Sequence, residues 1–354
     1  MRTSYRSADW VMLSAVVALA VLSLFHLYTI AFPDQVHYFF RQVIWVGIGL
    51  GLLLIASLLK ISFWRKIAYI VYGIVLLALI MVLFSTGSIH GAHRWLKIGR
   101  ITFQPSEFAK LALILVLGKI LANKEKIGWS EVGISLCFAF PFLILVAAQP
   151  DLGSAFIFLF LWIGMLFLTG IPFKRFLFIL GTIFLLVASS YSFLRPYQKM
   201  RILAFLNPEK DPLGTGWSIL QSRVTLGSGG LIGKGVGRAV HTQLKFLSQP
   251  FTDFIFASIG EEWGFIGVLI ILGLYFVIIT RGVMISKENG GSFAGLVSAG
   301  IIILFFLQIF INVGMTVGIM PVTGLPLPLM SYGGSSTIMF LLGMGMLFGL
   351  RRRY

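Results

Sequence analysis

Long apolar runs limit what this 354-residue chain can fold into more than any other feature. Ten such runs follow one another along the sequence, and a run of roughly 20 apolar residues is long enough to cross a bilayer as a helix. With 58% hydrophobic and 11% charged residues and a mean hydropathy of +0.96, the chain lacks the polar balance of a soluble domain. We therefore predict an all-α, polytopic membrane protein, with residues 1–354 forming one integral membrane domain.

The predicted helices are bounded by charges, prolines and glycines. They cover approximately Trp10 to Ala31, Phe40 to Leu59, Ile67 to Phe84, Phe108 to Leu121, Val132 to Ala148, Ser154 to Gly170, Phe176 to Phe193, Thr252 to Thr280, Phe293 to Gly318 and Ser335 to Leu350. The fourth run is short, so we expect its helix to begin nearer Pro105.

The basic residues indicate the orientation of the chain. The net charge of +16 could suggest a nucleic-acid ligand, but the charges are spread in small clusters between apolar runs, as at Lys60, Arg65 and Lys66. Every second connection is short and basic, so the positive-inside rule places both termini in the cytoplasm. No nucleic-acid partner is expected. Cys137, the single cysteine, lies in an apolar run and can form no intrachain disulfide.

The connections assigned to the outer face hold most of the polar residues. The largest are residues 85–107, 194–251 and 319–334. The second, between the seventh and eighth predicted helices, is too polar to span a membrane and is the expected place for substrate. The third contains Pro321, Pro326 and Pro328, so it cannot form a regular helix. It either lines a cavity or is a stiff hairpin between two helices.

An acidic stretch opens the eighth predicted helix. If the helix begins at Thr252, then Asp253, Ala257 and Glu261 fall on one face and form a groove of acidic and small residues. Carboxylates are costly at membrane depth and are often functional there. The alternative is that Asp253 caps the helix or neutralises a nearby arginine.

A glycine-rich segment precedes this helix, at residues 221–237. It does not fit the phosphate-binding loop of nucleotide enzymes, which would require glycine at Ser228 and Ser or Thr at Gly235. The glycines would still let backbone amides approach an anionic group closely. Arg223, Lys234, Arg238 and Lys245 add positive charge, whereas a surface turn without a ligand is the alternative.

Three further positions are candidates for specific roles. Trp95 lies between basic residues and is either an interfacial anchor or a functional side chain. Glu107 and Lys110 are three residues apart at the start of the fourth helix and are predicted to form a structural ion pair. Asp151 lies in a tight turn, and only a nearby cation would give it a larger role.

Five segments resemble one known family. They are QPSEFAK at residues 104–110, QPDLGSA at 149–155, DPLGTGW with QSRVTLGSGGLIGKG at 211–235, TDFIFASIGEEWGF at 252–265 and GLPLPLMSYGGSS at 324–336. In this order on ten helices they are similar to the SEDS family of peptidoglycan glycosyltransferases. Thr242, Gln243 and the prolines at 326 and 328 look more like its elongation branch, which maintains rod shape, than its division branch.

The resemblance implies a polymerase of lipid II, with both donor and acceptor bound on the outer face of the bacterial cytoplasmic (inner) membrane. It implies that Asp253 is catalytic, that Trp95 is functionally sensitive and that Glu107 and Lys110 form an important pair. A class B penicillin-binding transpeptidase and the rest of the elongation machinery are the implied partners. One segment departs from the family: where an acid and a histidine are expected, the chain has Gln249 and Phe251.

The expected mechanism is an inverting displacement. Asp253 would accept the proton of a lipid II sugar hydroxyl, which attacks the anomeric carbon of the donor. Residues predicted to contact substrate are Trp95, Lys110, Arg223, Lys234, Arg238 and Glu261. Cleavage of the donor pyrophosphate supplies the energy, so no nucleotide is needed, while a divalent cation such as Mg²⁺ is left open. The alternatives are a lipid II flippase, a division-type polymerase or a scaffold.

Overall fold

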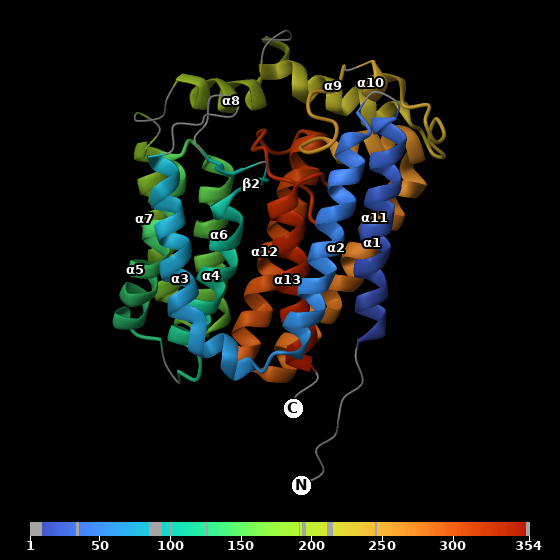
Figure 1. Ribbon diagram of the computed structural model, residues 1–354. Coiled ribbons are helices and arrows are strands. Elements are labelled where there is room, and N and C mark those ends of the chain that lie inside the picture. The colour runs from blue at the N-terminus through green and yellow to red at the C-terminus, as the bar shows by residue number, and fades with distance from the viewer. Residues whose placement is uncertain are drawn as a thin grey trace.

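Ten helices stand side by side in the computed structural model and correspond to the ten predicted runs (Figure 1). The structure describes residues 9–32, 35–84, 94–99, 101–124, 127–190, 192, 196–210, 215–244 and 246–351. The ten helices are α1 (Trp10–Ala31), α2 (His37–Leu58), α3 (Ile61–Leu83), α4 (Pro105–Leu121), α5 (Trp129–Ala148), α6 (Leu152–Leu168), α7 (Phe173–Ser190), α11 (Ile255–Asn289), α12 (Phe293–Val317) and α13 (Gly334–Arg351).

Not all ten meet the length expected of a membrane helix. Among the described residues, 7 helices are long and apolar enough to cross a bilayer: α1, α2, α3, α5, α11, α12 and α13. The apolar helix α6 and the buried helix α4 have 17 residues each. A count of ten crossings therefore stays a prediction.

Several helices begin or end at other residues than predicted. Helix α4 starts at Pro105, as expected, because proline suits the first turn of a helix. Helix α3 begins at Ile61 rather than Ile67, and α11 continues past Thr280 to Asn289. In both, basic residues assigned to a connection lie within the helix, since long basic side chains can reach water from a helix end.

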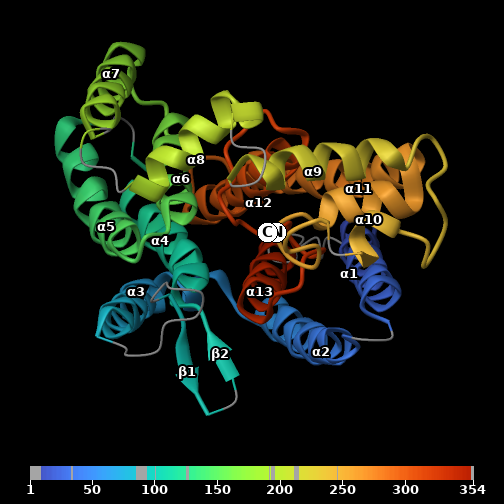
Figure 2. The same cartoon turned by 90° about the horizontal axis from the view of Figure 1, so that it is seen from above.

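Helices α12 and α13 occupy the centre of the bundle. In each, 78% of the most apolar 18-residue window is buried, compared with 28% in α2, α3 and α5. Viewed from above, α3, α5 and α7 lie at the periphery (Figure 2). Large apolar side chains such as Ile70, Leu77 and Phe184 are exposed there. An apolar belt of this extent is typical of a surface that contacts lipid.

The two ends of the bundle differ. One end carries the antiparallel hairpin of β1 (Leu96–Ile98) and β2 (Ile101–Phe103) together with α8 (Pro196–Leu206), η2 (Pro208–Lys210), α9 (Thr215–Ser228) and α10 (Val240–Gln243) (Figure 1). The region expected to be a loop is thus largely helical. At the opposite end, Asp9, which precedes α1, contacts Arg351 of α13 and lies 3.9 Å from Arg281 of α11. These contacts connect the three helices.

Candidate functional site

Asp253 lies in a tight turn and not in a helix. Helix α11 begins at Ile255, so the predicted start at Thr252 and the acidic stripe from Asp253 to Glu261 are wrong. Gln249 has a positive φ of 49°, and its carbonyl accepts hydrogen bonds from the backbone N–H groups of Thr252 and Phe254. The helix has no side-chain cap. Asp253 therefore does not cap the helix, contrary to one alternative.

Helix α12 and the proline-containing connection that follows it hold this turn in place. Asn312 Nδ2 donates to the carbonyl oxygens of Asp253, at 2.9 Å, and Leu325, at 2.8 Å. Ser331 Oγ donates to Thr252 O at 2.6 Å, and Tyr332 N donates to Phe251 O at 2.8 Å. These bonds fix the backbone on both sides of Asp253.

The Asp253 side chain faces the same connection. A β-carbon added at Gly324 would lie 3.5 Å from Asp253 Oδ2, which shows how closely the backbone passes the carboxylate. Gly324 has a φ of 75°, a conformation that glycine adopts without strain. The connection therefore packs directly against the Asp253 carboxylate.

Two arginines act on the Asp253 carboxylate. Burial raises its pKa above the ordinary value of 3.8, while a hydrogen bond with the Thr252 side chain and the charges of Arg201 and Arg94 act in the opposite direction. The charge of Asp151 adds to the rise. Burial dominates, so the carboxyl group retains its proton to a higher pH than an exposed aspartate.

These charged residues come from three different connections. Arg94 donates from Nε to Gln149 O at 3.1 Å, hydrogen bonds to Pro150 O, and lies 3.9 Å from Asp151. Arg201, on α8, donates to Val322 O at 3.3 Å. Asp151 caps α6 by accepting from Ser154 N and Ser154 Oγ. Neither Arg94 nor Arg201 was predicted to belong to the site. The larger role of Asp151 depended on a nearby cation, and Arg94 supplies that cation.

The Glu107 and Lys110 side chains meet as predicted. Lys110 Nζ lies 2.5 Å from Glu107 Oε1, and the two side chains are 0% and 3% exposed, respectively. Glu107 Oε2 has no hydrogen-bond partner among the described residues. Trp95 is partly buried just before β1.

The glycine-rich segment joins α11 at a break in the helix. Gly264 has φ 68° and ψ −167°, which interrupts the helical hydrogen bonds. Four backbone bonds replace them, from Lys234 N to Glu261 O, Gly235 N to Glu262 O, Phe265 N to Gly230 O and Ile266 N to Leu231 O. An added β-carbon at Gly229 would lie 1.9 Å from Gly260 O, and one at Gly233 would lie 2.3 Å from Glu262 O. Glycine is required there for close backbone packing.

Lys234 and Gly237 of this segment, together with residues of α10, bind two carboxylates of α11. Glu261 accepts from Lys234 Nζ at 2.7 Å, His241 N at 2.9 Å and both the backbone and the hydroxyl of Thr242. Glu262 accepts from Gly237 N, at 2.6 Å, and Thr29 Oγ1, and lies 2.6 Å from His26 Nδ1. The anionic groups that the segment and α10 contact are these two buried glutamates, and a role of the segment in substrate binding stays a prediction.

None of the other predicted basic residues is among the main influences on the pKa of Asp253. Lys234 pairs with Glu261, Arg223 donates to Gly318 O at 2.9 Å, and Arg238 is exposed. Lys245 lies outside the described residues. The described residues contain no group of three His, Cys, Asp or Glu side chains that could hold a metal ion.

Comparison with known proteins gives consistent matches over the whole chain. Residues 6–354 match the model of the FtsW/RodA/SpoVE family, described as "Cell cycle protein". The chain is 36% identical over 317 residues to "Peptidoglycan glycosyltransferase MrdB" of Escherichia coli (strain K12), covering 88% of this chain and 84% of the relative. It is 34% identical over 364 residues to "Stage V sporulation protein E" of Bacillus subtilis (strain 168), covering 99% of each.

Two solved structures have the same fold. One chain, from work described as "Structural coordination of polymerization and crosslinking by a peptidoglycan synthase complex", is 34% identical with a TM-score of 0.86 and 98% coverage of both chains. The rod shape determining protein RodA of Thermus thermophilus is 31% identical with a TM-score of 0.74 and 99% coverage of both.

Proposed function

This chain belongs to the FtsW/RodA/SpoVE family of multi-pass membrane proteins, and from that premise we propose that it is a peptidoglycan glycosyltransferase that polymerises lipid II. The observation that carries the proposal is the position of Asp253. Its partly buried carboxylate has a raised pKa, is subject to the charges of Arg94 and of Arg201 on α8, and lies two residues before the start of α11. Groups with a shifted pKa in such positions are typical of acid–base chemistry.

The reaction needs a base and a site for a leaving pyrophosphate. Asp253 accepts the proton from a sugar hydroxyl of the acceptor lipid II. The hydroxyl oxygen then forms a bond to the anomeric carbon of the donor glycan, whose bond to undecaprenyl pyrophosphate breaks with inversion. The pyrophosphate leaves with the bonding electrons. A base placed in this way contributes about 10²- to 10⁴-fold to the rate.

Arg94 and Arg201 are the best-placed cations for the departing pyrophosphate. Both act on Asp253, and arginine can bind phosphate oxygens through two parallel hydrogen bonds. Positive charge at that point stabilises the negative charge that develops in the transition state. Lys110, Arg223, Lys234 and Arg238 are secondary candidates, because Lys110 and Lys234 already pair with glutamates.

The relatives support a role in the cell wall. We assign the chain to the inner membrane, with Asp253 on the outer face where lipid-linked sugars are used, and to elongation because of the similarity to MrdB and RodA. A transpeptidase that crosslinks the new strands is the proposed partner, since one structural relative belongs to a complex of polymerization and crosslinking.

The test is polymerisation of labelled lipid II by purified protein in detergent. The wild type is expected to make glycan strands, and Asp253→Asn, which keeps the size but removes the base, is expected to lose at least about 10²-fold in rate. Product made without a membrane compartment cannot arise from transport, so it separates the polymerase from a flippase. Lack of polymer from the wild type with its transpeptidase present, or full activity of Asp253→Asn, would refute the proposal.

A further inference from the structure

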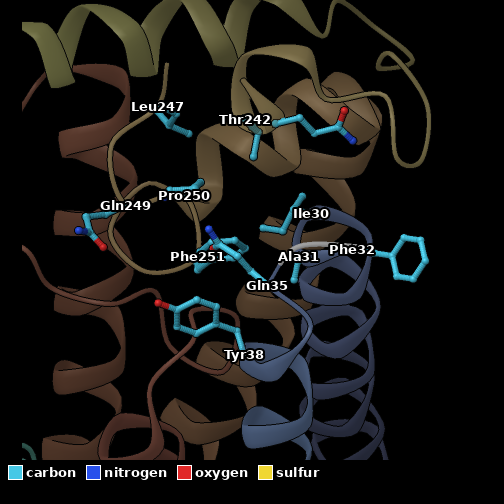
Figure 3. A pocket seen from close by; sticks show the side chains of 11 residues that line it. Ile30, Ala31, Phe32, Gln35, Tyr38, Thr242, Leu247, Gln249, Pro250 and Phe251 are labelled. Atoms are coloured by element: carbon cyan, nitrogen blue, oxygen red, sulfur yellow. The ribbon is translucent and has the colours of Figure 1, made fainter. Parts of the chain in front are cut away.

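A cavity of about 490 Å³ opens next to the turn that carries Asp253 (Figure 3). It lies between the end of α1, the start of α2, α10 and the segment that follows α10. Its lining residues are Ile30, Ala31, Phe32, Gln35, Tyr38, Thr242, Gln243, Leu247, Gln249, Pro250 and Phe251. The volume is in the range of small-molecule sites, about 300 to 1,000 Å³. None of the lining residues is charged, so the cavity is poorly suited to a pyrophosphate.

Several polar groups in this lining have no partner within the protein. The side chains of Gln35 and Gln249 and the hydroxyl of Tyr38 form no hydrogen bond to any residue that the structure describes. Gln35 and Tyr38 are partly buried. An amide offers two donors and an acceptor, and a phenol offers one of each. Such groups match the hydroxyl and acetamido groups of a sugar.

Aromatic rings form one wall. Tyr38 stacks on Phe251 with ring centroids 5.0 Å apart and an interplanar angle of 21°, and Tyr332 meets Tyr38 edge-on at 4.8 Å. Gln35, Tyr38 and Phe251 all contribute side chains to the lining of the cavity (Figure 3). The bond from Tyr332 N to Phe251 O holds the wall in place. An aromatic wall with a few oriented polar groups is a common form of small-molecule site.

We propose that this cavity is a subsite for an uncharged sugar of the substrate, which Gln35 and Tyr38 recognise by hydrogen bonds and the Tyr38–Phe251 wall by apolar contact. The inference rests on the proposed function. Gln249, Pro250 and Phe251 line the cavity and belong to the turn that carries Asp253, so a sugar in the cavity is bound at the same turn as the proposed base. The charged pyrophosphate of the substrate then lies on the side of the turn with Arg94 and Arg201, and the uncharged sugar lies in this cavity.

The subsite also accounts for the segment that departs from the family pattern. Gln249 and Phe251 stand where the resemblance implies an acid and a histidine, and both line the cavity. In this chain, recognition at this point therefore uses neutral groups.

The test measures binding of N,N′-diacetylchitobiose, a soluble acetamido sugar, to the full chain in lipid nanodiscs by saturation-transfer NMR. Gln35→Leu and Tyr38→Phe each remove one hydrogen-bonding group and should weaken binding about two- to tenfold. Gln221→Leu is the matched control, because Gln221 is a partly buried amide on α9, outside the cavity, with no side-chain hydrogen bond to the described residues. It should bind the sugar as the wild type does.

Unchanged binding in both Gln35→Leu and Tyr38→Phe, or no more binding to the wild type than to empty nanodiscs, would overturn the subsite. Asp253→Asn separates the two proposals, because it should lose polymerisation and keep sugar binding. A wild type that binds the sugar and makes no polymer refutes the polymerase and supports the cavity as a sugar site. A wild type that polymerises without a binding defect in the two variants refutes only the subsite.

Discussion

The Asp253 carboxylate is subject to two opposing influences at the residue scale. Burial favours its protonated form, and Arg201 and Arg94 favour its ionised form. A general base works best when its pKa is near the operating pH, because it is then both ionised and able to hold a proton. The surroundings of Asp253 move its pKa in that direction.

The pH dependence of polymerisation follows from this shift. Asp253 acts only when ionised, so the rate is lost as the pH falls through the raised pKa, and the acidic limb of the rate profile should lie above 3.8, the ordinary value. Arg201→Gln removes a charge that favours ionisation and should move the limb to higher pH. Lys287→Gln, an exposed position near the end of α11, should leave it in place. If the acidic limb lies at the same pH in the wild type, Arg201→Gln and Lys287→Gln, then Arg201 does not lower the pKa of Asp253.

The buried pair of Glu107 and Lys110 should matter more for stability than an exposed pair. Glu107→Gln leaves an unpaired ammonium group in the core, and loss of one partner of a buried pair costs about 3 to 5 kcal/mol. The double variant Glu107→Gln with Lys110→Met should recover much of that loss. Thermal unfolding in detergent measures both.

A matched control comes from Lys124 and Glu131, 3.4 Å apart with side chains 46% and 20% exposed. Lys124→Met should cost less than about 1 kcal/mol, as is typical of surface pairs. Equal losses in Glu107→Gln and Lys124→Met would show that burial of the first pair carries no stability.

At the scale of elements, the break in α11 at Gly264 is what connects the bundle to the segment above it. The helix gives up its own hydrogen bonds there and receives four from residues 230–235. Close approach of two backbones is needed for these bonds, and glycines on both sides permit it.

Two glycines of the same segment test this requirement. Gly229→Ala would place a β-carbon 1.9 Å from Gly260 O, so the two backbones must separate, at a cost of about 1 to 3 kcal/mol. Gly227→Ala meets nothing within 4 Å and lies in α9, where alanine is favoured by about 0.5 to 1 kcal/mol. Opposite shifts in melting temperature are expected. A similar melting temperature for both variants would exclude tight packing at Gly229.

The sequence was sufficient to predict the ten helical regions, because long apolar runs report helices without reference to their neighbours. It was insufficient for α8, α9 and α10, whose apolar residues are too few to give a clear period. The start of α11 was missed because the turn at Gln249 has no glycine or asparagine to mark it. Asp253 was a candidate because of its acidic stretch, and the ion pair of Glu107 and Lys110 was predicted from their spacing, whereas the resemblance supplied only their implied roles. Arg94, Arg201 and Asp151 come together only through tertiary structure.

At the scale of the whole molecule, the chain has an apolar belt between two polar ends, and the proposed site lies next to the end with α8, α9 and α10. This arrangement requires that end to face outward if lipid-linked sugars are to reach Asp253. The ends of α1, α11 and α13 joined by Asp9, Arg281 and Arg351 then face the cytoplasm.

Cysteine labelling tests this orientation. In a Cys137→Ser background, Val236→Cys places a thiol at a position that is 55% exposed near α10, and Ser62→Cys places one at the exposed start of α3. A membrane-impermeant maleimide should label the first in intact spheroplasts and the second only after permeabilisation. The reverse pattern would place Asp253 on the cytoplasmic side and rule out the proposed reaction there.

The joint at Gly264 also determines which parts can be recombined between relatives. A graft of residues 194–251 alone would replace one side of the four backbone hydrogen bonds at the break. It would also replace the hydrogen-bond donors to Glu261 and Glu262 that come from this segment. A graft that includes residues 229–266 transfers donors, acceptors and carboxylates together. The natural module of this protein is therefore the extramembrane segment plus the first turns of α11, and chimaeras cut at the membrane surface should fail where those cut below Gly264 succeed.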